Sequence, residues 1–447
     1  MSRWRRTLAL WLYSQLMRLL TPLIVLRYLW RSRREPLYGR WLRERFGLGR
    51  PVTPGAVWIH AVSLGETRAA APLIQALRMQ QPDVHLLLTH GTATGRETGA
   101  MLLAEGDEQR WLPLDLPGAT HRFMRRHRPA IGVLMETEVW PNLQRAAADQ
   151  GVPMLLVNAR LSPRSLAKSL RFDALLRPAA QSMTLTLAQT TEDAQRLMTA
   201  GARPVQVCGN LKFDLLPDPG LLERGRRWRA ALPLTQGGKQ PRRVVLAAVW
   251  REGEDELLLT IWRQWLLSLP QRNTTAWPLL LIVPRHPQRF DEVAQMVVKH
   301  GLELSRRSEW PDDAPPGSAM HADVWLGDSL REMPAYYALA DVALLGGSFA
   351  PLGGQNLIEA AACGCPLVMG PHTFNFSHAA DLAAAQGAAQ RAADLGEAVA
   401  MAGQMAGDDH ALAERAAACL RFSRAHQGAA TRCAAAVLAH WHPPIGA

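Results

Sequence analysis

Glutamates at two predicted strand ends could move a proton or stabilise positive charge. Glu66 follows the apolar run Ala56–Val62 and opens a helical stretch, and Glu136 and Glu138 follow the apolar run Ile131–Met135. A carboxylate at a strand end could act as a general base on a hydroxyl. A helix start favours the charged form, so a base at Glu66 requires burial by the substrate to raise its pKa. The alternatives are a helix-start charge for Glu66 and a solvated loop for Glu136.

Two cations are candidates for contacts with negative charge. Only four of the 50 basic residues are lysines, and Lys212 lies in Gly209-Asn-Leu-Lys-Phe-Asp214, after a predicted strand. A lysine kept in an arginine-rich chain suggests a need for a compact ammonium group, although chance retention explains it equally well. Arg285 follows Pro284 at another predicted strand end, where it could reach a phosphate or carboxylate. A purely structural arginine is the alternative.

Glycine-rich turns and a capped helix predict an anion site. Gly346-Gly-Ser348 ends a predicted strand, and Asn356 begins a helix with Glu359 three residues later, which resembles a capping box. Free N–H groups at such a start attract anions, whereas Glu359 could turn outward to a ribose hydroxyl. Gly327-Asp-Ser-Leu-Arg-Glu-Met333 is typical of a turn and a helix start, whose N–H groups could cradle a nucleotide phosphate; an ordinary capped helix is the alternative. The sequence matches neither the P-loop nor the dinucleotide-binding glycine pattern.

Alternating apolar and helical stretches must position these residues. The pattern predicts βαβ units around parallel sheets. The predicted strands are Ala56–Val62, His85–Thr89, Ile131–Met135, Met154–Val157, Leu185–Ala188 and Val205–Cys208, followed by Val244–Ala248, Leu279–Val283, Val342–Leu345 and Pro366–Met369. A stretch rich in proline, glycine and basic residues between the two series marks a boundary. We therefore predict two doubly wound α/β domains, residues 51–220 and 221–447, with ligands beyond the C-terminal strand ends in an interdomain cleft.

The net charge of +11 is concentrated at the N-terminus, where residues 1–50 contain twelve arginines and two glutamates. Nucleic-acid binding would require a basic face on a folded domain, whereas basic residues beside apolar ones favour an anionic membrane surface. Leu8–Trp30 is apolar but is interrupted by Arg18 and Arg27. We predict that residues 1–50 associate with a membrane, either as a tilted span or as an interfacial amphipathic helix. A buried first helix is the alternative. If the segment spans, the arginines that follow it place the body in the cytoplasm.

With these features together, the chain resembles the 3-deoxy-D-manno-octulosonic acid (Kdo) transferases of lipopolysaccharide biosynthesis over nearly its whole length. The likeness rests on the apolar-basic N-terminus and on Ser63-Leu-Gly-Glu66, Met135-Glu-Thr-Glu-Val-Trp-Pro-Asn142, Gly209-Asn-Leu-Lys-Phe-Asp214, Pro284-Arg-His-Pro287, Gly327-Asp-Ser329 and Gly370-Pro-His-Thr-Phe-Asn-Phe376. The resemblance implies a GT-B glycosyltransferase fold of two Rossmann-like domains, with the acceptor in the first and the CMP-sugar in the second. It implies inverting transfer of Kdo from CMP-Kdo to the lipid A precursor (lipid IVA) at the cytoplasmic side of the cell inner membrane.

The resemblance also implies roles for individual residues. Glu66 would be the general base, with Glu136 and Lys212 as transition-state stabilisers. The CMP contacts would be Pro284, Arg285, Leu330, Arg331, Glu332, Asn356, Leu357, Ile358 and Glu359. Many family members have proline at the position of Leu357; proline is favourable there but dispensable, so the helix cap should survive. The implied partners are CMP-Kdo, the lipid A precursor and anionic inner-membrane lipids, with no nucleic acid and no cofactor.

No Asp-x-Asp motif follows a predicted strand, so we expect no metal. Two other functions remain open at the level of sequence. One is a different GT-B enzyme, such as a UDP-sugar transferase or a non-hydrolysing sugar-nucleotide epimerase. The other is a membrane-attached binding protein without enzymatic activity.

Overall fold

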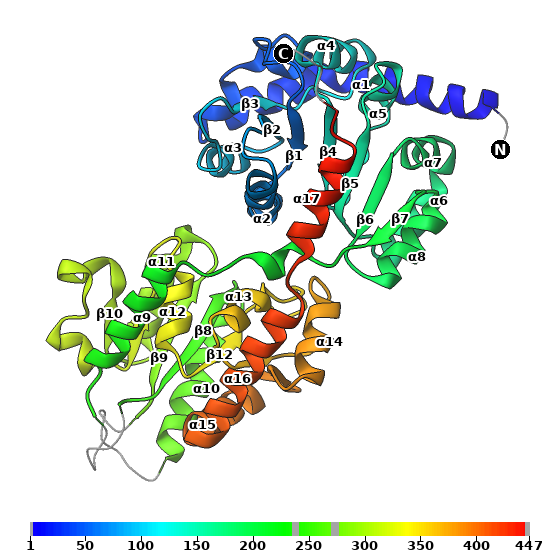
Figure 1. The fold of residues 1–447 in the computed structure, drawn as a ribbon. Helices are drawn as coiled ribbons and strands as arrows, with labels where there is room; N and C mark the ends of the chain where they lie inside the picture. Colours follow the sequence, from blue (N-terminus) through cyan, green and yellow to red (C-terminus); the bar gives the residue numbers. More distant parts are fainter. Residues whose placement is uncertain (1–2, 235–240, 270–276, 443–447) are drawn as a thin grey trace. The chain divides into compact units, whose positions relative to one another are not determined.

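The computed structural model describes residues 3–234, 241–269 and 277–442, which form two compact units (Figure 1). The first unit contains Met1–Leu215 and Gln427–Ala447, and the second contains Leu216–His426. Each unit is built on its own parallel sheet. The predicted α/β class is therefore confirmed, with two Rossmann-like domains.

The sheet of the first unit has seven strands within the described residues, in the order β3-β2-β1-β4-β5-β6-β7. The strands are β1 (Val57–His60), β2 (Leu86–His90), β3 (Glu108–Trp111), β4 (Ile131–Met135), β5 (Met154–Ala159), β6 (Leu185–Ala188) and β7 (Val205–Val207). After β3 the chain returns to the middle of the sheet, so β1 and β4 are parallel neighbours. Their carboxyl ends form the switch point at which ligands bind in open α/β sheets.

Both faces of this sheet are buried, which explains why its central strands are continuously apolar. Val57 and Ile59 of β1 pack into one hydrophobic core, and Trp58, between them, packs into another on the opposite face. The edge strand β3 was not predicted from the sequence. Its residues Glu108–Trp111 are mostly polar, and only Trp111 is buried, so the apolar pattern of a strand is absent.

Helices connect these strands, and several begin at a side-chain cap. The helices of this unit are α1 (Arg3–Arg31), α2 (Leu64–Gln80), α3 (Ala93–Ala100), α4 (Pro117–His127), α5 (Pro141–Asp149), α6 (Pro163–Arg171), α7 (Asp173–Gln181), α8 (Thr191–Ala200), the 3-10 helices η1 (Pro36–Gly39), η2 (Leu42–Phe46) and η3 (Leu211–Asp214), and the C-terminal α17 (Ala429–Ala439). Ser63 caps α2 and Thr190 caps α8 by accepting hydrogen bonds from backbone N–H groups.

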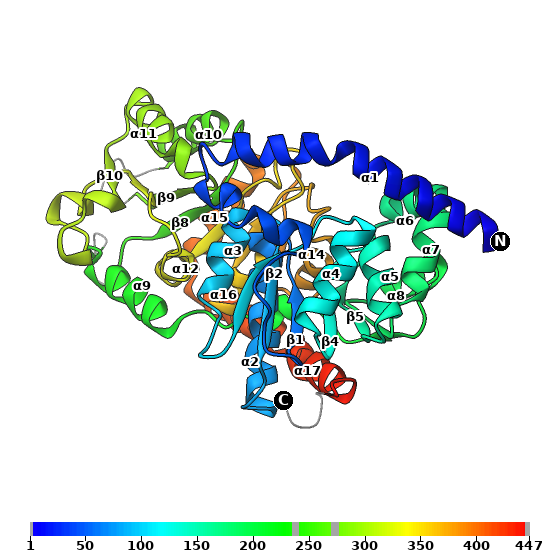
Figure 2. The same ribbon diagram turned by 90° about the horizontal axis from the view of Figure 1, so that it is seen from above.

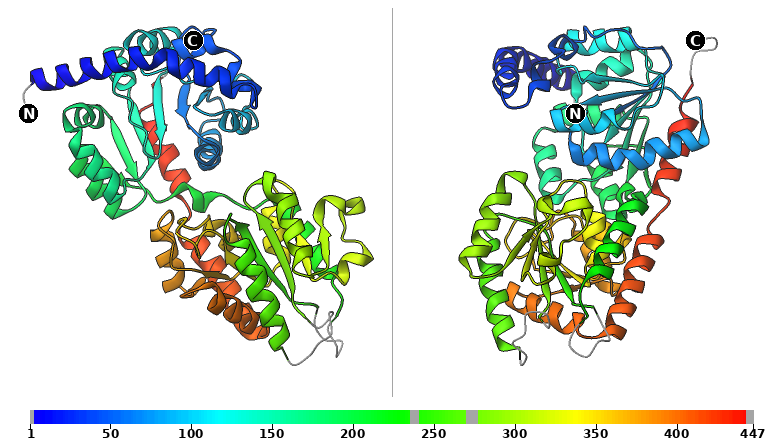
Figure 3. Two further views of the ribbon diagram at one scale, coloured as in Figure 1. Left: turned by 180° about the vertical axis from the view of Figure 1, so that it is seen from behind. Right: turned by 90° about the vertical axis from the view of Figure 1, so that its left-hand side faces the viewer.

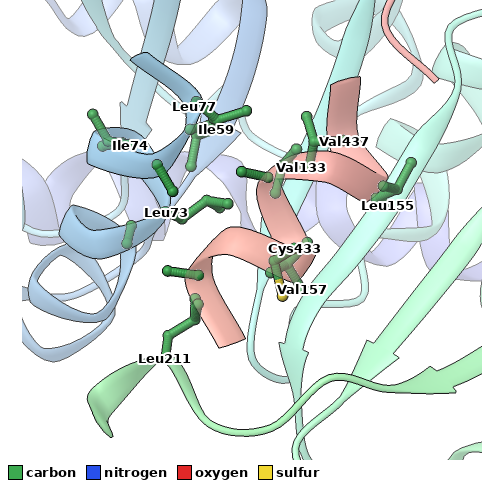
Figure 4. Close-up of a cluster of buried hydrophobic side chains, with 14 of the residues drawn as sticks. Ile59, Leu73, Ile74, Leu77, Val133, Leu155, Val157, Leu211, Cys433 and Val437 are labelled. Carbon is green, nitrogen blue, oxygen red and sulfur yellow. The ribbon is translucent and has the colours of Figure 1, made fainter. Parts of the chain in front are cut away.

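The placement of α17 corrects the predicted domain boundary. A single domain was predicted from residue 221 to residue 447, but α17 belongs to the first unit (Figures 1 and 3). Its Cys433 and Val437 lie in the core beside Leu73 of α2 and Val157 of β5 (Figure 4). Asp214 fixes its start by accepting from the N–H groups that open the helix. Local composition could not reveal this return, because an alanine-rich helix packs equally well on either domain.

The sheet of the second unit also has seven strands among the residues described, in the order β10-β11-β9-β8-β12-β13-β14. Its strands are β8 (Val244–Trp250), β9 (Leu279–Pro284), β10 (Leu304–Arg306), β11 (Val324–Leu326), β12 (Val342–Leu345), β13 (Leu367–Met369) and β14 (Ala389–Arg391). Its α-helices are α9 (Pro219–Ala231), α10 (Asp255–Ser268), α11 (Phe290–Lys299), α12 (Met333–Leu339), α13 (Leu357–Ala362), α14 (Ser377–Ala385), α15 (Leu395–Ala406) and α16 (Asp409–Ala425). The central strand β8 pairs with β9 on one side and β12 on the other, so the loops after these strands share one edge of the sheet.

Candidate active site

Glu66 lies in the first turn of α2, directly after β1, and its carboxylate turns back to the end of the strand. It accepts from the Val62 N–H at 2.7 Å and from the Ser63 hydroxyl at 3.0 Å. Burial raises the pKa of Glu66 above its usual value, the Val62 and Ser63 hydrogen bonds oppose this, and the nearby charge of Glu136 adds to it. From the sequence, burial by the substrate was expected to oppose the effect of the helix start; in the structure the protein itself already buries Glu66 enough to raise its pKa.

Glu136 lies at the end of β4 and is paired with two cations. Arg160, after β5, approaches one carboxylate oxygen at 3.1 Å, and Lys212 of η3 approaches the other at 3.5 Å. Glu136 is 7% exposed and its φ is +59°, an uncommon conformation for a residue other than glycine. Such strain is found at functional positions. The structure therefore brings Glu136 and Lys212 together, which is necessary if both residues act in one site.

Lys212 is positioned by the residues around it. Asn210 caps η3 by accepting from the Lys212 N–H at 3.0 Å. Asn158, fully buried at the end of β5, accepts from the Leu211 N–H at 3.1 Å. Together with the contact of Asp214 to α17, these bonds fix the backbone of the motif. Its asparagine and aspartate are therefore structural, and the lysine side chain is left to face Glu136.

Glu138 is a third carboxylate at this edge of the sheet. Burial, followed by the charge of Glu66, raises the pKa of Glu138 to about 7, against a lowering effect of the Trp140 indole. Neighbouring carboxylates with differently shifted pKa values are typical of sites that divide acid and base roles. The first unit thus combines a partly buried glutamate that is able to accept a proton with a carboxylate held between two cations.

In the second unit, Arg285 lies at the end of β9 and is exposed. Its N–H donates to the Trp250 carbonyl at 2.8 Å, which fixes it beside the end of β8. Arg251 follows β8 directly. Burial, then the charges of Arg285 and Arg251, lower the pKa of His286, so both arginines lie near this histidine. This is a cationic edge suited to a phosphate.

Leu330, Arg331 and Glu332 precede α12, and the structure separates their roles. Leu330 and Arg331 are exposed, and Arg331 has a φ of +67°. The Glu332 carboxylate is 2.6 Å from Arg224 and 3.0 Å from Arg307 and also accepts from its own turn, so it already has protein partners. This segment would therefore meet a nucleotide through its backbone and its two exposed side chains.

Asn356 caps α13 by accepting from the Ile358 N–H at 3.3 Å, so the predicted cap survives with leucine at 357. Leu357 and Ile358 are buried, and Glu359 is half-buried near Tyr337, whose pKa is raised by burial and then by the Glu359 charge. The Asn356 and Glu359 side chains are thus the ones in this group able to meet a ligand.

A buried glutamate that the sequence analysis missed shapes the neighbouring glycine turn. Glu254, at the start of α10, accepts from the N–H groups of Gly347, Phe349 and Ala350 at 2.7–3.2 Å. A Cβ at Gly346 would lie 2.5 Å from the Val249 carbonyl oxygen, so only glycine fits there. Arg160 and Arg251 were also missed, although each follows a strand that the sequence predicted. Placing them requires the strand order, which local patterns do not contain.

Comparisons with known proteins agree closely with one another. A family profile described as 3-Deoxy-D-manno-octulosonic-acid transferase (kdotransferase) matches residues 40–215. The 3-deoxy-D-manno-octulosonic acid transferase of Bordetella pertussis is 46% identical over 434 residues, which are 94% of this chain and 96% of that protein. The protein of the same name from Haemophilus influenzae is 34% identical over 371 residues, 81% of this chain and 82% of that protein.

A solved structure supports the fold. The putative UDP-N-acetylglucosamine 2-epimerase from Listeria monocytogenes has a TM-score of 0.56 to this chain at 12% identity, over 87% of this chain and 97% of that one. At that identity the likeness concerns the fold alone, and it agrees with the predicted GT-B class.

Proposed function

This chain belongs to the 3-deoxy-D-manno-octulosonic acid transferase family, and from that membership we propose that it transfers Kdo from CMP-Kdo to the lipid A precursor lipid IVA, with inversion at the anomeric carbon. The observation that carries the proposal is the acid–base arrangement in the first unit. Glu66, whose pKa is raised, lies near Glu136, which is held by Lys212 and Arg160.

Glu66 is the proposed general base. An acceptor hydroxyl oxygen bonds to the anomeric carbon while its proton passes to the Glu66 carboxylate. The carboxylate keeps free lone pairs for this, because two oxygens offer about four acceptor positions and the Val62 and Ser63 bonds use two. A pKa above the usual glutamate value moves the base towards neutral pH, where general-base catalysis is more effective.

Glu136 and Lys212 are the proposed transition-state stabilisers. Positive charge develops at the anomeric carbon as its bond to the phosphate oxygen breaks and the electron pair leaves with CMP. A fixed carboxylate stabilises that charge without reorganisation during the step. Lys212 and Arg160, at 3.5 and 3.1 Å, hold the Glu136 charge in place and compensate for its burial.

The departing CMP is proposed to bind the second unit. Arg285, with Pro284 before it, and the neighbouring Arg251 would neutralise the phosphate by charge-assisted hydrogen bonds. The turn at Leu330, Arg331 and Glu332 and the start of α13 would hold the rest of the nucleotide. The α13 contacts would come from Asn356, Leu357, Ile358 and Glu359.

The lipid acceptor fits a membrane-associated chain. Among the described residues, α1 is the one helix long and apolar enough to cross a membrane, with a mean hydropathy of 1.4 in its most apolar part, of which 6% is buried. Arginines at both ends of α1 would bind anionic lipids. We therefore propose that the protein works at the cytoplasmic side of the cell inner membrane.

A transfer assay tests the function directly. Purified full-length protein is incubated in detergent with CMP-Kdo and a tetraacyl disaccharide phosphate acceptor, and the product is identified by mass. A mass increase of Kdo units is expected, and no product would refute the proposal. UDP-sugars in parallel reactions test the alternative of a UDP-sugar enzyme. A protein that binds both substrates but never turns over would be a binding protein.

A further inference from the structure

One face of α1 is apolar and exposed along the whole helix. Its large side chains recur every three or four residues, which places them on a single stripe. The exposed members are Trp4, Leu8, Trp11, Leu12, Leu16, Leu19, Leu23, Leu26, Leu29 and Trp30. A contiguous apolar patch of this size marks an interaction surface. Figure 2 shows α1 as a long helix on the outside of the first unit. The side chains of the stripe are exposed in the part of the chain that the structure describes.

Charge at the end of the stripe indicates its partner. Arg27, Arg31, Arg33 and Arg34 surround a cavity of about 540 Å³ beside Trp30. Glu35 is the one acidic residue that lines it, and it is paired with Arg31 at 2.8 Å. Arginines and tryptophan beside an apolar stripe match the headgroup layer of an anionic bilayer. The occupant of this face is therefore a lipid surface.

The opposite face of α1 packs on the first unit, against α5 and α7. Ser14 is only 5% exposed, and its hydroxyl lies 3.1 Å from the Asn142 side-chain oxygen while also donating to the Leu10 carbonyl. The neighbouring Tyr13 hydroxyl donates to the Asp115 carboxylate at 2.9 Å. The middle of α1 is thus attached to the domain by buried polar contacts.

The contacts of Tyr13 and Ser14 lead to the first turn of α5. Asp115, 1% exposed, accepts from the N–H groups of Asn142 at 3.2 Å and Leu143 at 2.8 Å, and its carbonyl accepts from the Asn142 side chain at 2.8 Å. Because α5 begins at Pro141, this network fixes the end of the segment that begins at Glu136. The segment carries two of the three site carboxylates.

We propose that α1 lies along the bilayer surface and that Tyr13 and Ser14, through Asp115 and Asn142, hold the segment from Glu136 to Asn142 in its working position. Tyr13 and Ser14 are then positioning residues for the transfer reaction, which rests on the function proposed above. A helix attached to the domain at its middle cannot cross the bilayer without breaking these buried contacts. Membrane attachment and the geometry of the acceptor side consequently depend on the same helix.

The test separates positioning from attachment. Tyr13→Phe and Ser14→Ala, singly and together, remove hydroxyls from the buried face and leave the apolar stripe intact. Because a displacement of about 1 Å can cost about 10²-fold in rate, the double variant should lose about 10- to 100-fold in single-turnover transfer. Its sedimentation with anionic vesicles and the Kd for CMP should equal those of the wild type.

Matched controls remove hydroxyls that do not reach the network. Tyr38→Phe removes a buried hydroxyl for which no partner exists among the described residues. Thr21→Val removes a hydroxyl that donates to the Met17 carbonyl of its own helix. Both should keep the wild-type transfer rate.

Two outcomes would overturn the proposal. One is a double variant with native thermal stability and a wild-type transfer rate. The other is equal loss of rate in the Tyr38 and Thr21 controls, which would indicate general destabilisation. An inactive wild-type protein would instead refute the proposed function, so the two failures are distinguishable. If the first outcome were accompanied by loss of vesicle binding, these hydroxyls would serve attachment alone.

Discussion

Replacing Glu66 by glutamine tests the proposed base, because the change keeps size and hydrogen-bonding geometry. The glutamine oxygen can still accept from the Val62 N–H, and its amide can donate to the Ser63 oxygen, so both contacts of the carboxylate have a neutral equivalent. The raised pKa of Glu66 means that its surroundings disfavour the charge. Glu66→Gln should therefore unfold no more easily than the wild type at neutral or alkaline pH.

The rate is expected to fall because the amide cannot accept the proton. Loss of a general base costs about 10²–10⁴-fold, which corresponds to about 3–5 kcal/mol of activation free energy. The wild-type rate should decline as the pH falls through the pKa of Glu66, because the protonated form cannot act as a base. Since burial raises that pKa, the decline lies above the usual glutamate range, and Glu66→Gln should flatten it.

The assay is single-turnover transfer with enzyme in excess over labelled CMP-Kdo, measured from acidic to alkaline pH. This isolates the chemical step from product release. A folded Glu66→Gln protein with a near-wild-type rate would refute the assignment and leave Glu66 as a helix-start charge. The assignment would also be refuted if the rate of Glu66→Gln declined at acidic pH in the same way as the wild-type rate. If part of the decline at acidic pH is due to Glu138, that part should move to lower pH in Glu66→Gln. The reason is that the Glu66 charge helps to raise the pKa of Glu138.

Glu136→Gln should also slow single turnover, because it removes a negative charge beside the developing cation. The decline of the rate at acidic pH should remain in this variant. If that decline were lost, Glu136 and not Glu66 would be the base. Arg285→Ala should weaken CMP binding in calorimetry by about 1.5–3 kcal/mol, the worth of a charged hydrogen bond, and leave acceptor affinity unchanged. Equal losses for both substrates would place Arg285 outside the nucleotide site. The pKa of Glu138 is about 7 in the folded protein, which is above its value in the unfolded chain. Glu138 therefore destabilises the fold as the pH rises from the unfolded pKa to the folded one, because the folded state disfavours the charged carboxylate. In denaturant unfolding, Glu138→Gln should therefore be more stable than the wild type at alkaline pH, by up to about 3 kcal/mol, and equally stable at acidic pH; equal stability at both would contradict the shift.

The sequence by itself determined most of the elements that position the site, although the short strands β10, β11 and β14 of the second unit were not predicted. Strands such as Ile131–Met135 are buried on both faces and therefore appear as uninterrupted apolar runs. Motifs with several fixed residues, such as Met135–Asn142, identified the family before any geometry was known. The polar edge strand Glu108–Trp111 was missed because a strand with one buried residue carries no apolar pattern.

The tertiary structure alone decided which side chains meet. Glu136 and Arg160 are 24 residues apart in sequence and touch because β4 and β5 are neighbours in the sheet. The pKa of Glu66 was open in the sequence, since a helix start lowers it and burial raises it, and only the packing determines which effect is larger. The return of α17 to the first unit and the attachment of α1 through Ser14 likewise depend on long-range contacts. Such contacts have no local signature, because any apolar helix face can pack against any complementary one.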